Sequence, residues 1–361
     1  MHDHPLSPPS SMLGTDPAVE QDSSLEDQLR VNPDRFRVLT GDRPTGSLHL
    51  GHYFGTLQNR VRLQNLGVES FVLIADYQVL TDRDVANNLE LAVHGLVLDY
   101  LAVGIDPLRT TIFTHSAIAA LNQLLLPFLS LVSVAELERN PTVKDEITHS
   151  KQSSVSGLMF TYPVHQAADI LFCKANVVPV GIDQLPHLEL TRTIARRFNT
   201  RYAPEKSIFA EPTALLSAAP LLLGTDGGKM SKSRNNAVAL ADDADTTARL
   251  IRGAKTDSFR QISYDPEHRP EVSSLVLLAA LCQNKDPYEV GDELGSAGSG
   301  ALKSLVIDAV NEHLAPIRAR RIELAKDPGY LRDVLRVGNQ RANAVAEQTL
   351  EEVRKAMKTY Y

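Results

Sequence analysis

Short apolar runs alternate with segments of helical periodicity between residues 36 and 236. Four segments, 36–40, 70–75, 110–114 and 177–181, read as strands, and 70–75 is a continuous apolar run, as a parallel strand covered on both faces would show. Helical patterns lie between them. One opens at Leu48, and another, which Asp84 can cap, continues to Leu101. This order predicts an α/β fold whose first domain is a Rossmann-type parallel sheet.

The strand pattern ends after Asn236. Helical runs follow at 243–254, 272–282, 300–326 and 330–360, which predict a helical C-terminal domain. We place this domain at 237–335 and expect the last helix, 336–361, to pack back on the sheet domain at 35–236. Residues 1–34 contain prolines, serines and scattered acids without periodicity, so we expect a disordered N-terminal extension, whose possible protein partner is unknown.

The composition is that of an ordinary globular protein, with 43% hydrophobic and 22% charged residues. No apolar run is long enough to span a bilayer, and the N-terminus lacks the pattern of a secretory signal. The two cysteines, Cys173 and Cys282, exclude a disulfide framework and leave no basis for a cysteine zinc site. These features indicate a cytoplasmic protein with no membrane role.

The net charge of −7 argues weakly against a nucleic-acid ligand, but a local basic face matters more than the total. The arginines that could form such a face are Arg192, Arg196, Arg197, Arg201, Arg318, Arg320 and Arg321. Each of them could equally belong to a solvated helix face.

The stretch after the first strand has the order strand, turn, helix start. Gly41, Pro44 and Gly46 punctuate the turn, and His49-Leu50-Gly51-His52 opens the helix. A helix N-terminus offers unpaired N–H groups and about half a positive charge, which suits phosphate. The two histidines share one face of the first turn, and the glycine between them lets a flat ring approach the backbone. The alternative is a structural corner with two surface histidines.

A second motif, Lys229-Met230-Ser231-Lys232-Ser233, lies far along the chain after a glycine-rich loop at 224–228. Its lysines and serines are donors that suit phosphate. Taken alone, this motif could be a solvated surface loop. Together and in this order, the two motifs favour a site in which both close over one nucleoside triphosphate.

The two motifs, HLGH and KMSKS, resemble the signature pair of the class I aminoacyl-tRNA synthetases. The segments GDRPTGSLHLGHYFGTL, YLAVGIDP, ELERNPTVKDE, TYPVHQAADIL, VPVGIDQ and KTDS resemble the bacterial tryptophanyl-tRNA synthetases, and the similarity runs from about residue 36 to the C-terminus. The resemblance implies a ligase of protein biosynthesis. It would activate L-tryptophan with ATP to tryptophanyl-adenylate and transfer it to tRNA(Trp), releasing AMP and diphosphate.

The resemblance also implies roles around ATP. The phosphates would be bound by His49, His52, Lys229 and Lys232. Lys144 would be a third lysine near them, although without the resemblance the sequence indicates only an exposed lysine at this position. Mg²⁺ would share the phosphate charge and needs little dedicated protein ligation, so no set of metal ligands is expected. The residues expected to bind ATP are Arg43, Pro44, Thr45, Gly51, His52, Gly181, Ile182, Asp183, Lys229, Met230, Ser231, Lys232 and Ser233. Arg43 stands where many members of the family have glutamine, and Asp183 could also be a helix N-cap.

The expected amino-acid pocket consists of Tyr162, Gln166, Asp169 and Gln184. The first three recur at four and three residues, so one helical face carries them. The resemblance implies that Asp169 accepts the indole N–H and that Tyr162 and Gln184 hold the α-amino group. A buried polar cluster that ties the helix to the sheet is the alternative. Many members have methionine at the position of Gln166, and Tyr-x-x-x-Gln-x-x-Asp resembles the tyrosine enzyme, so a tyrosyl-tRNA synthetase stays an alternative.

Synthetases for these two aromatic amino acids are usually homodimers. The apolar segment 124–134 could supply the interface, or it could be an internal helix kinked at Pro127. In a dimer the tRNA would dock across two subunits, and the helical domain would contact the anticodon. The N-terminal extension and Gln166 keep open a synthetase-like, tryptophan-binding regulatory protein with weak tRNA charging. An adenylyltransferase acting on a cofactor precursor has no need of the helical domain.

Overall fold

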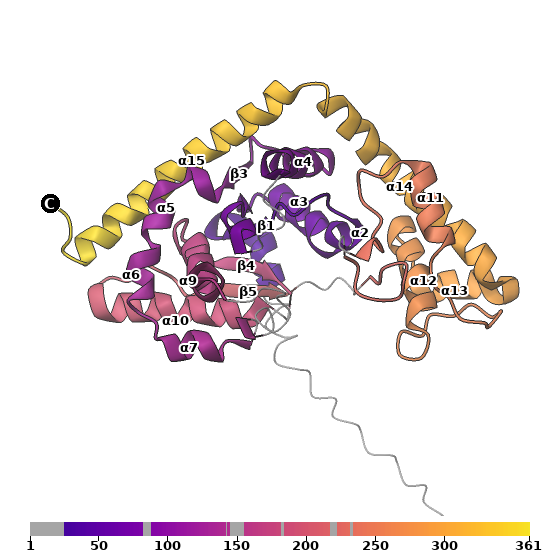
Figure 1. The fold of residues 1–361 in the computed structure, drawn as a ribbon, viewed down its shortest axis with the longest axis horizontal. Coiled ribbons are helices and arrows are strands. Elements are labelled where there is room, and N and C mark those ends of the chain that lie inside the picture. The colour runs from indigo at the N-terminus through magenta and orange to yellow at the C-terminus, as the bar shows by residue number, and fades with distance from the viewer. Residues whose placement is uncertain are drawn as a thin grey trace, which may run out of the picture.

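The computed structural model describes residues 25–81, 88–141, 143–144, 155–181, 184–216, 222–231 and 234–361 (Figure 1). A parallel five-stranded sheet has the order β3-β2-β1-β4-β5. Its strands are β1 (Arg37–Asp42), β2 (Glu69–Ile74), β3 (Thr110–Thr114), β4 (Val177–Val180) and β5 (Thr213–Leu216). The predicted Rossmann-type α/β class is confirmed, and β5 is the strand that the apolar pattern did not predict.

The sheet is the middle layer of its domain. On β2, Phe71 and Leu73 belong to one hydrophobic core, while Val72 and Ile74 belong to a second core on the other face. Successive side chains of a strand point to opposite faces, so both faces of β2 are covered. The covering helices include α3 (Gln58–Leu66), α4 (Leu89–Ala102), α9 (Gly157–Leu171) and α10 (Leu185–Tyr202).

The segment 124–134 forms a short helix followed by a loop, rather than one kinked helix. Helix α5 (Ala119–Gln123) ends before Leu124, α6 (Leu125–Leu129) contains Pro127, and α7 (Val134–Arg139) follows. Phe128 is fully buried, whereas Leu126 and Val134 are 75% and 63% exposed. The segment therefore contributes to the core and also presents apolar side chains on the surface.

The C-terminal part is helical from residue 244 onward. Its helices are α11 (Ala244–Arg252), α12 (Pro270–Gln283), α13 (Pro287–Leu294), α14 (Gly298–Leu324) and α15 (Pro328–Ala356). Four of them match the predicted runs, and α13 was not predicted. Helix α15 is continuous through residue 336, where a boundary was expected, and it lies beside β3 and α5 (Figure 1). None of the described helices is long and apolar enough to cross a membrane.

Close contacts hold α15 against the edge strand of the sheet. A Cβ on Gly338 would lie 1.8 Å from the carbonyl oxygen of Ile112, so only glycine fits there. The next residue, Asn339, accepts a hydrogen bond from the backbone N–H of Thr114 at 3.0 Å. The helix backbone therefore touches the strand backbone directly.

The prediction of disorder up to residue 34 is wrong for its last part. Residues 25–31 are helical, and Leu25 and Leu29 are buried in a small core with Val38 and Val177. Two leucines four residues apart lie on one face of a helix, so seven residues can bury a stripe against the sheet domain. Residues 1–24 lie outside the described residues.

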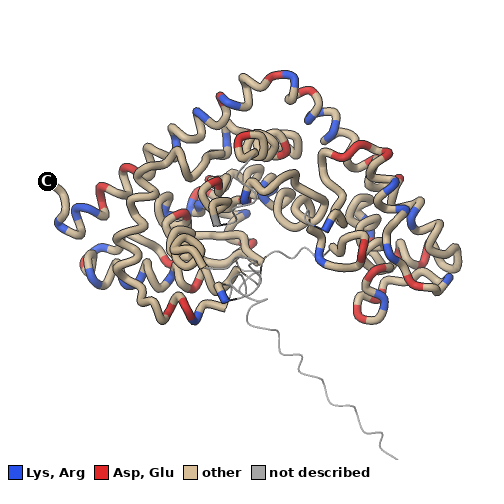
Figure 2. Tube along the Cα trace, viewed as in Figure 1, with Lys and Arg blue, Asp and Glu red and all other residues tan. Residues whose placement is uncertain are grey.

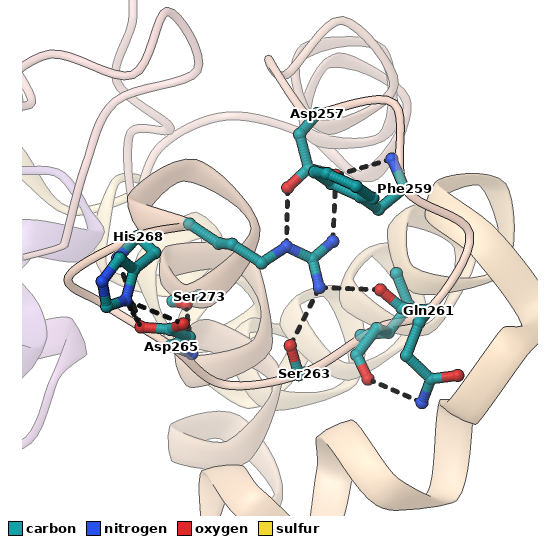
Figure 3. A network of polar contacts seen from close by, with 9 residues as sticks. Asp257, Phe259, Gln261, Ser263, Asp265, His268 and Ser273 are labelled. Atoms are coloured by element: carbon teal, nitrogen blue, oxygen red, sulfur yellow. Dashed lines mark hydrogen bonds and ion pairs between the residues drawn. The ribbon is translucent and has the colours of Figure 1, made fainter.

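The loop between α11 and α12 contains the KTDS stretch and is held by one arginine. Arg269 donates from Nε and Nη2 to Asp257 at 2.7 and 2.9 Å, and from Nη1 to the carbonyl of Gln261 and the hydroxyl of Ser263 (Figure 3). A bidentate Arg–carboxylate pair fixes geometry as well as charge. The loop is thus anchored to the N-cap of α12.

Candidate active site

The sheet order places the candidate site at its switch point. Strands β1 and β4 are neighbours, and the chain leaves them toward β2 and β5, which lie on opposite sides. In open parallel sheets, ligands bind at the carboxyl ends of the strands where the order reverses. The HLGH motif follows β1 and Gly181 follows β4. Ile182 and Asp183 lie outside the described residues.

The two histidines open the helix that follows β1. His49 is the extended N-cap of α2 (Leu50–His52), and the helix continues through a π-helical turn, η2 (Tyr53–Leu57), into α3. The rings of His49 and His52 lie 3.7 Å apart, centroid to centroid. The backbone N–H of His49 donates to Nδ1 of His52 at 3.2 Å. A neutral His52 therefore carries its proton on Nε2, where it can donate to a ligand.

The turn between β1 and this helix is clamped at both ends. Asp42 accepts hydrogen bonds from Arg60 at 2.5 Å and from the Tyr100 hydroxyl at 2.7 Å. Burial alone would raise the pKa of Asp42, but the Arg60 charge and these hydrogen bonds outweigh it and hold the pKa below its usual value. At the other end, the N–H of Leu48 donates to Asp99 at 3.2 Å. Between the clamps lie exposed Arg43, buried Pro44 and exposed Thr45.

The two signature motifs are adjacent in the structure. A Cβ on Gly51 would lie 3.1 Å from the His49 ring and 3.5 Å from Sδ of Met230, so the second motif packs against the glycine of the first. Leu50 donates its N–H to the carbonyl of Val238 at 3.0 Å. The N–H of residue 240 in turn donates to the carbonyl of residue 48 at 2.9 Å. A short antiparallel pairing thus fixes the lysine segment beside the helix start.

Asn236, which the sequence analysis did not single out, organises the loop that carries the lysines. Its side chain is 2% exposed, and its amide donates to Asp226 at 2.7 Å and to the carbonyl of Lys229 at 3.1 Å. Its oxygen accepts the N–H of Ser231 at 2.7 Å. The Asn236 hydrogen bond lowers the pKa of Asp226. Lys229 itself is exposed, and Lys232 and Ser233 lie outside the described residues.

Helix α9 carries the residues expected to bind the amino acid. Tyr162 and Asp169 are buried, and Gln166 is half-buried. The Tyr162 hydroxyl is 2.9 Å from Nε2 of His187. Gln184 is the N-cap of α10, and its N–H donates to the carbonyl of Gly181 at 3.0 Å. The Tyr162 end of the α9 stripe therefore faces a polar group, as either a ligand pocket or a structural polar cluster requires.

His115 is the partner of Asp169, and no sequence signal pointed to it. Its Nε2 lies 2.8 Å from Oδ1 of Asp169, and since an ionised carboxylate only accepts, the imidazole donates. His115 and Asp169 are 0% and 1% exposed. The other oxygen, Oδ2, makes no hydrogen bond to the described residues. Asp169 thus keeps one acceptor position for a ligand.

His165 lies beside this pair. Its ring centroid is 4.6 Å from that of His115, and its Nε2 faces the amide oxygen of Asn122 at 2.8 Å. Burial lowers the pKa of His165, so the ring is neutral at physiological pH. One ligand atom each of His115, His165 and Asp169 lies within 4.8 Å of the others, so these three residues could hold a metal ion. Such an ion would replace the hydrogen bond between His115 and Asp169.

Comparison with known proteins decides the family. The chain matches the family model of class I tRNA synthetases (W and Y) over residues 32–315. This chain belongs to that family. The synthetase is 43% identical over 335 residues to the tryptophan–tRNA ligase of Clostridium longisporum, which covers 90% of this chain and 97% of the relative. It is 43% identical over 338 residues to that of Streptococcus pneumoniae, covering 90% and 98%.

Solved structures agree with this assignment. The tryptophanyl-tRNA synthetase of Campylobacter jejuni, complexed with ADP and tryptophan, superposes with a TM-score of 0.77 at 29% identity. The match covers 89% of this synthetase and 99% of that chain. The five-stranded sheet and the helical C-terminal part therefore share the family's architecture.

Most of the arginines proposed as a basic face are bound within the synthetase. Arg196 pairs with Glu211 and Arg197 with Glu136, whose pKa the Arg197 hydrogen bond lowers to about 2. Other pairs and hydrogen bonds occupy Arg192, Arg318 and Arg321. Figure 2 shows basic residues interspersed with acidic ones along the described chain. At these positions the guanidinium groups have partners within the chain.

Lys144 stands at the end of a described helical turn of the synthetase. Its backbone N–H donates to the carbonyl of Asn140 at 3.1 Å, and its side chain is exposed. Asn140 is buried and lies 3.5 Å from Nδ1 of His187, the partner of Tyr162. The turn that carries Lys144 is therefore connected to the amino-acid side of the site.

Proposed function

We propose that this protein is a tryptophan–tRNA ligase. It activates L-tryptophan with ATP to tryptophanyl-adenylate and transfers the amino acid to tRNA(Trp), releasing AMP and diphosphate. The observation that carries the proposal is the contact between Gly51 of HLGH and Met230 of KMSKS. This contact occurs in a chain that aligns over 90% of its length with tryptophan–tRNA ligases. ATP would thus lie between a helix start and a lysine loop.

In the first step, a carboxylate oxygen of tryptophan attacks the α-phosphorus of ATP, and the bond to the bridging oxygen of the β-phosphate breaks. The step needs placement and charge stabilisation rather than a protein nucleophile. His52 donates from Nε2, and the positive end of the helix dipole at the helix start favours the phosphates. Lys229 and Lys232 hold the departing diphosphate, with Lys144 as a further cation. Mg²⁺, bound mainly by phosphate oxygens and water, shares their charge.

The remaining ATP contacts follow from the two loops. Arg43, exposed at the tip of the clamped turn, reaches a phosphate, while Pro44 and Thr45 shape the turn. Gly181, with Ile182 and Asp183, receives the adenosine after β4. In the second step, a ribose hydroxyl at the 3′ end of the tRNA attacks the carbonyl carbon of the adenylate, and AMP leaves.

Asp169 selects the indole ring in this proposal. Oδ2 accepts the indole N–H, while His115 donates to Oδ1 and fixes the orientation of the carboxylate. Tyr162 and Gln184 hold the α-amino group. A site built around a hydrogen bond rejects analogues that lack the donor by about 10⁴–10⁵-fold without editing.

Tyrosine is the second candidate substrate, because the half-buried amide of Gln166 makes no hydrogen bond to the described residues. That amide lies one turn from Asp169 and could bind a phenol hydroxyl together with it. Purified protein is therefore assayed for ATP–diphosphate exchange with tryptophan, with tyrosine and without amino acid. Exchange that depends on tryptophan supports the proposal; exchange with tyrosine alone would replace it by the second candidate.

The assembly that we propose is a cytoplasmic homodimer. Leu126 and Val134, both exposed on the segment 124–134, would lie in its interface. The helical part at 237–335 would contact the anticodon, and the helix at 336–361 would belong to the catalytic unit at 35–236. Charging of tRNA(Trp) with and without residues 1–24 separates a ligase from a regulatory relative. A protein that exchanges diphosphate but charges tRNA only weakly would support the regulatory alternative.

A further inference from the structure

One buried carboxylate connects the start of the HLGH motif to the helical C-terminal part. Asp99, on α4, is 1% exposed. Its Oδ2 accepts the N–H of Leu48, which is 51 residues away in sequence and directly precedes His49. Its Oδ1 accepts Nε of Arg321 at 2.7 Å, across 222 residues. Arg321 lies on α14. This helix is therefore connected, through Asp99, to the end of the turn 42–48 that leads into the HLGH motif.

The neighbour of Asp99 completes the clamp. Tyr100 donates to Asp42 at the beginning of the turn, while Asp99 accepts from Leu48 at its end. Two consecutive residues of α4 therefore hold both ends of the segment 42–48. Any shift of the Asp99 carboxylate moves the end that leads into His49.

Helix α14 makes a second contact beside the other histidine. Nε2 of His313 lies 3.1 Å from the hydroxyl of Tyr53, the residue after His52, and the two rings meet edge to face at 5.4 Å. Nδ1 of His313 faces the carbonyl of Cys282 on α12 at 3.2 Å. The helix start is thus held from α14 on both sides of the HLGH motif.

We propose that Arg321 and Asp99 are positioning residues of the adenylation site. Neither contacts the substrates; the ion pair fixes the Leu48 N–H and, with it, the backbone that carries His49 and His52. Loss of Arg321 removes the cation that compensates this buried carboxylate, which is costly and favours movement of the carboxylate toward water. Removal of Arg321 would therefore loosen the hydrogen bond to Leu48. The inference rests on the proposed function, because it assigns the HLGH segment to ATP.

The test compares Arg321→Leu with Arg318→Leu in the full-length protein. Arg318 lies on the same helix but donates to Asn311 and Thr247, within the helical part. We expect Arg321→Leu to lower kcat/KM for ATP in diphosphate exchange by up to about 10²-fold, the effect of a misplacement near 1 Å. KM for tryptophan should change less than about twofold, since the α9 pocket is untouched. Arg318→Leu should lower Tm but keep kcat/KM for the folded protein.

Conservative variants keep the test decisive. Arg321→Lys restores a cation and should recover part of the lost kcat/KM for ATP. If Arg321→Leu does not fold, Arg321→Lys is compared with Arg318→Lys in the same assay. ATP affinity measured by calorimetry on the same proteins should fall for the Arg321 variants only. Equal loss at both positions, or wild-type kinetics and ATP affinity in the Arg321 variants, would overturn the inference. Wild-type protein that binds ATP but exchanges no diphosphate would instead overturn the proposed function.

Discussion

Replacement of Asn236 by alanine tests how the lysine loop is held. The asparagine amide ties three parts of the loop together: the Asp226 carboxylate, the Lys229 carbonyl and the Ser231 N–H. The side chain is almost completely buried, so water cannot replace these bonds without entering the loop. The variant removes all three and leaves the loop without its central connection.

The expected effect follows from the two hydrogen bonds to backbone groups. Each contributes about 1 kcal/mol net, so their loss shifts the balance toward a displaced loop by about 2 kcal/mol, or about 30-fold. We expect kcat of ATP–diphosphate exchange to fall by that factor, because loop contacts that strengthen in the transition state act on kcat. KM for tryptophan should stay close to the wild-type value.

Two further variants serve as controls. Asn235→Gly changes the exposed neighbour, whose φ of 51° glycine adopts without strain, and should leave the rate unchanged. Asn236→Asp keeps the acceptor for Ser231 but places a second carboxylate beside Asp226, so it should be at least as impaired as the alanine variant. Exchange at the wild-type rate in Asn236→Ala would show that the loop is ordered by other contacts.

Three other predictions concern the pocket and the stability of the fold. Asp169→Asn should cripple tryptophan-dependent exchange while ATP affinity stays intact, and a normal rate would remove this residue from indole recognition. Gly338→Ala should destabilise the protein by about 1–3 kcal/mol or more in urea unfolding, because its methyl group overlaps the carbonyl of Ile112; an unchanged midpoint would contradict the close contact. The Arg197 hydrogen bonds depress the pKa of Glu136 from 4.5 to about 2, so this pair stabilises the fold above pH 4.5 and loses that contribution as the pH falls toward 2. The free energy of unfolding of the Glu136→Gln variant should therefore depend less on pH between 4.5 and 2. A pH dependence equal to that of the wild type would refute this prediction.

Much of the fold was accessible from the sequence because apolar runs mark strands that are buried on both faces. The runs at 36–40, 70–75, 110–114 and 177–181 match four strands within two residues at each end. Strand β5 (Thr213–Leu216) lacks the valines that marked the equally short β4, and α13 is a short helix that begins at a proline. The helix at 25–31 was missed because its two buried leucines stand in a polar, proline-rich context.

The candidate site was only partly accessible. The HLGH and KMSKS motifs are local, so sequence revealed them, and the resemblance supplied their roles. The contacts of Asp99, His115, Asn236 and Arg321 join residues that are distant in the chain or that belong to an irregular loop. No periodicity or spacing encodes such contacts, and only the folded backbone brings these groups together. The same reason explains why the partners that most of the candidate arginines have within the chain could not be predicted from the sequence.

The contact between α15 and β3 has a consequence for solubility. Strand β3 is at one end of the sheet, and an open strand edge invites pairing with a second chain. Asn339 caps the N–H of Thr114, and the close approach at Gly338 leaves no room for another strand beside Ile112. The helix thus shields the peptide groups of this edge from intermolecular β-pairing. Detachment of α15 from an intact sheet would therefore uncover a strand edge that can template aggregation.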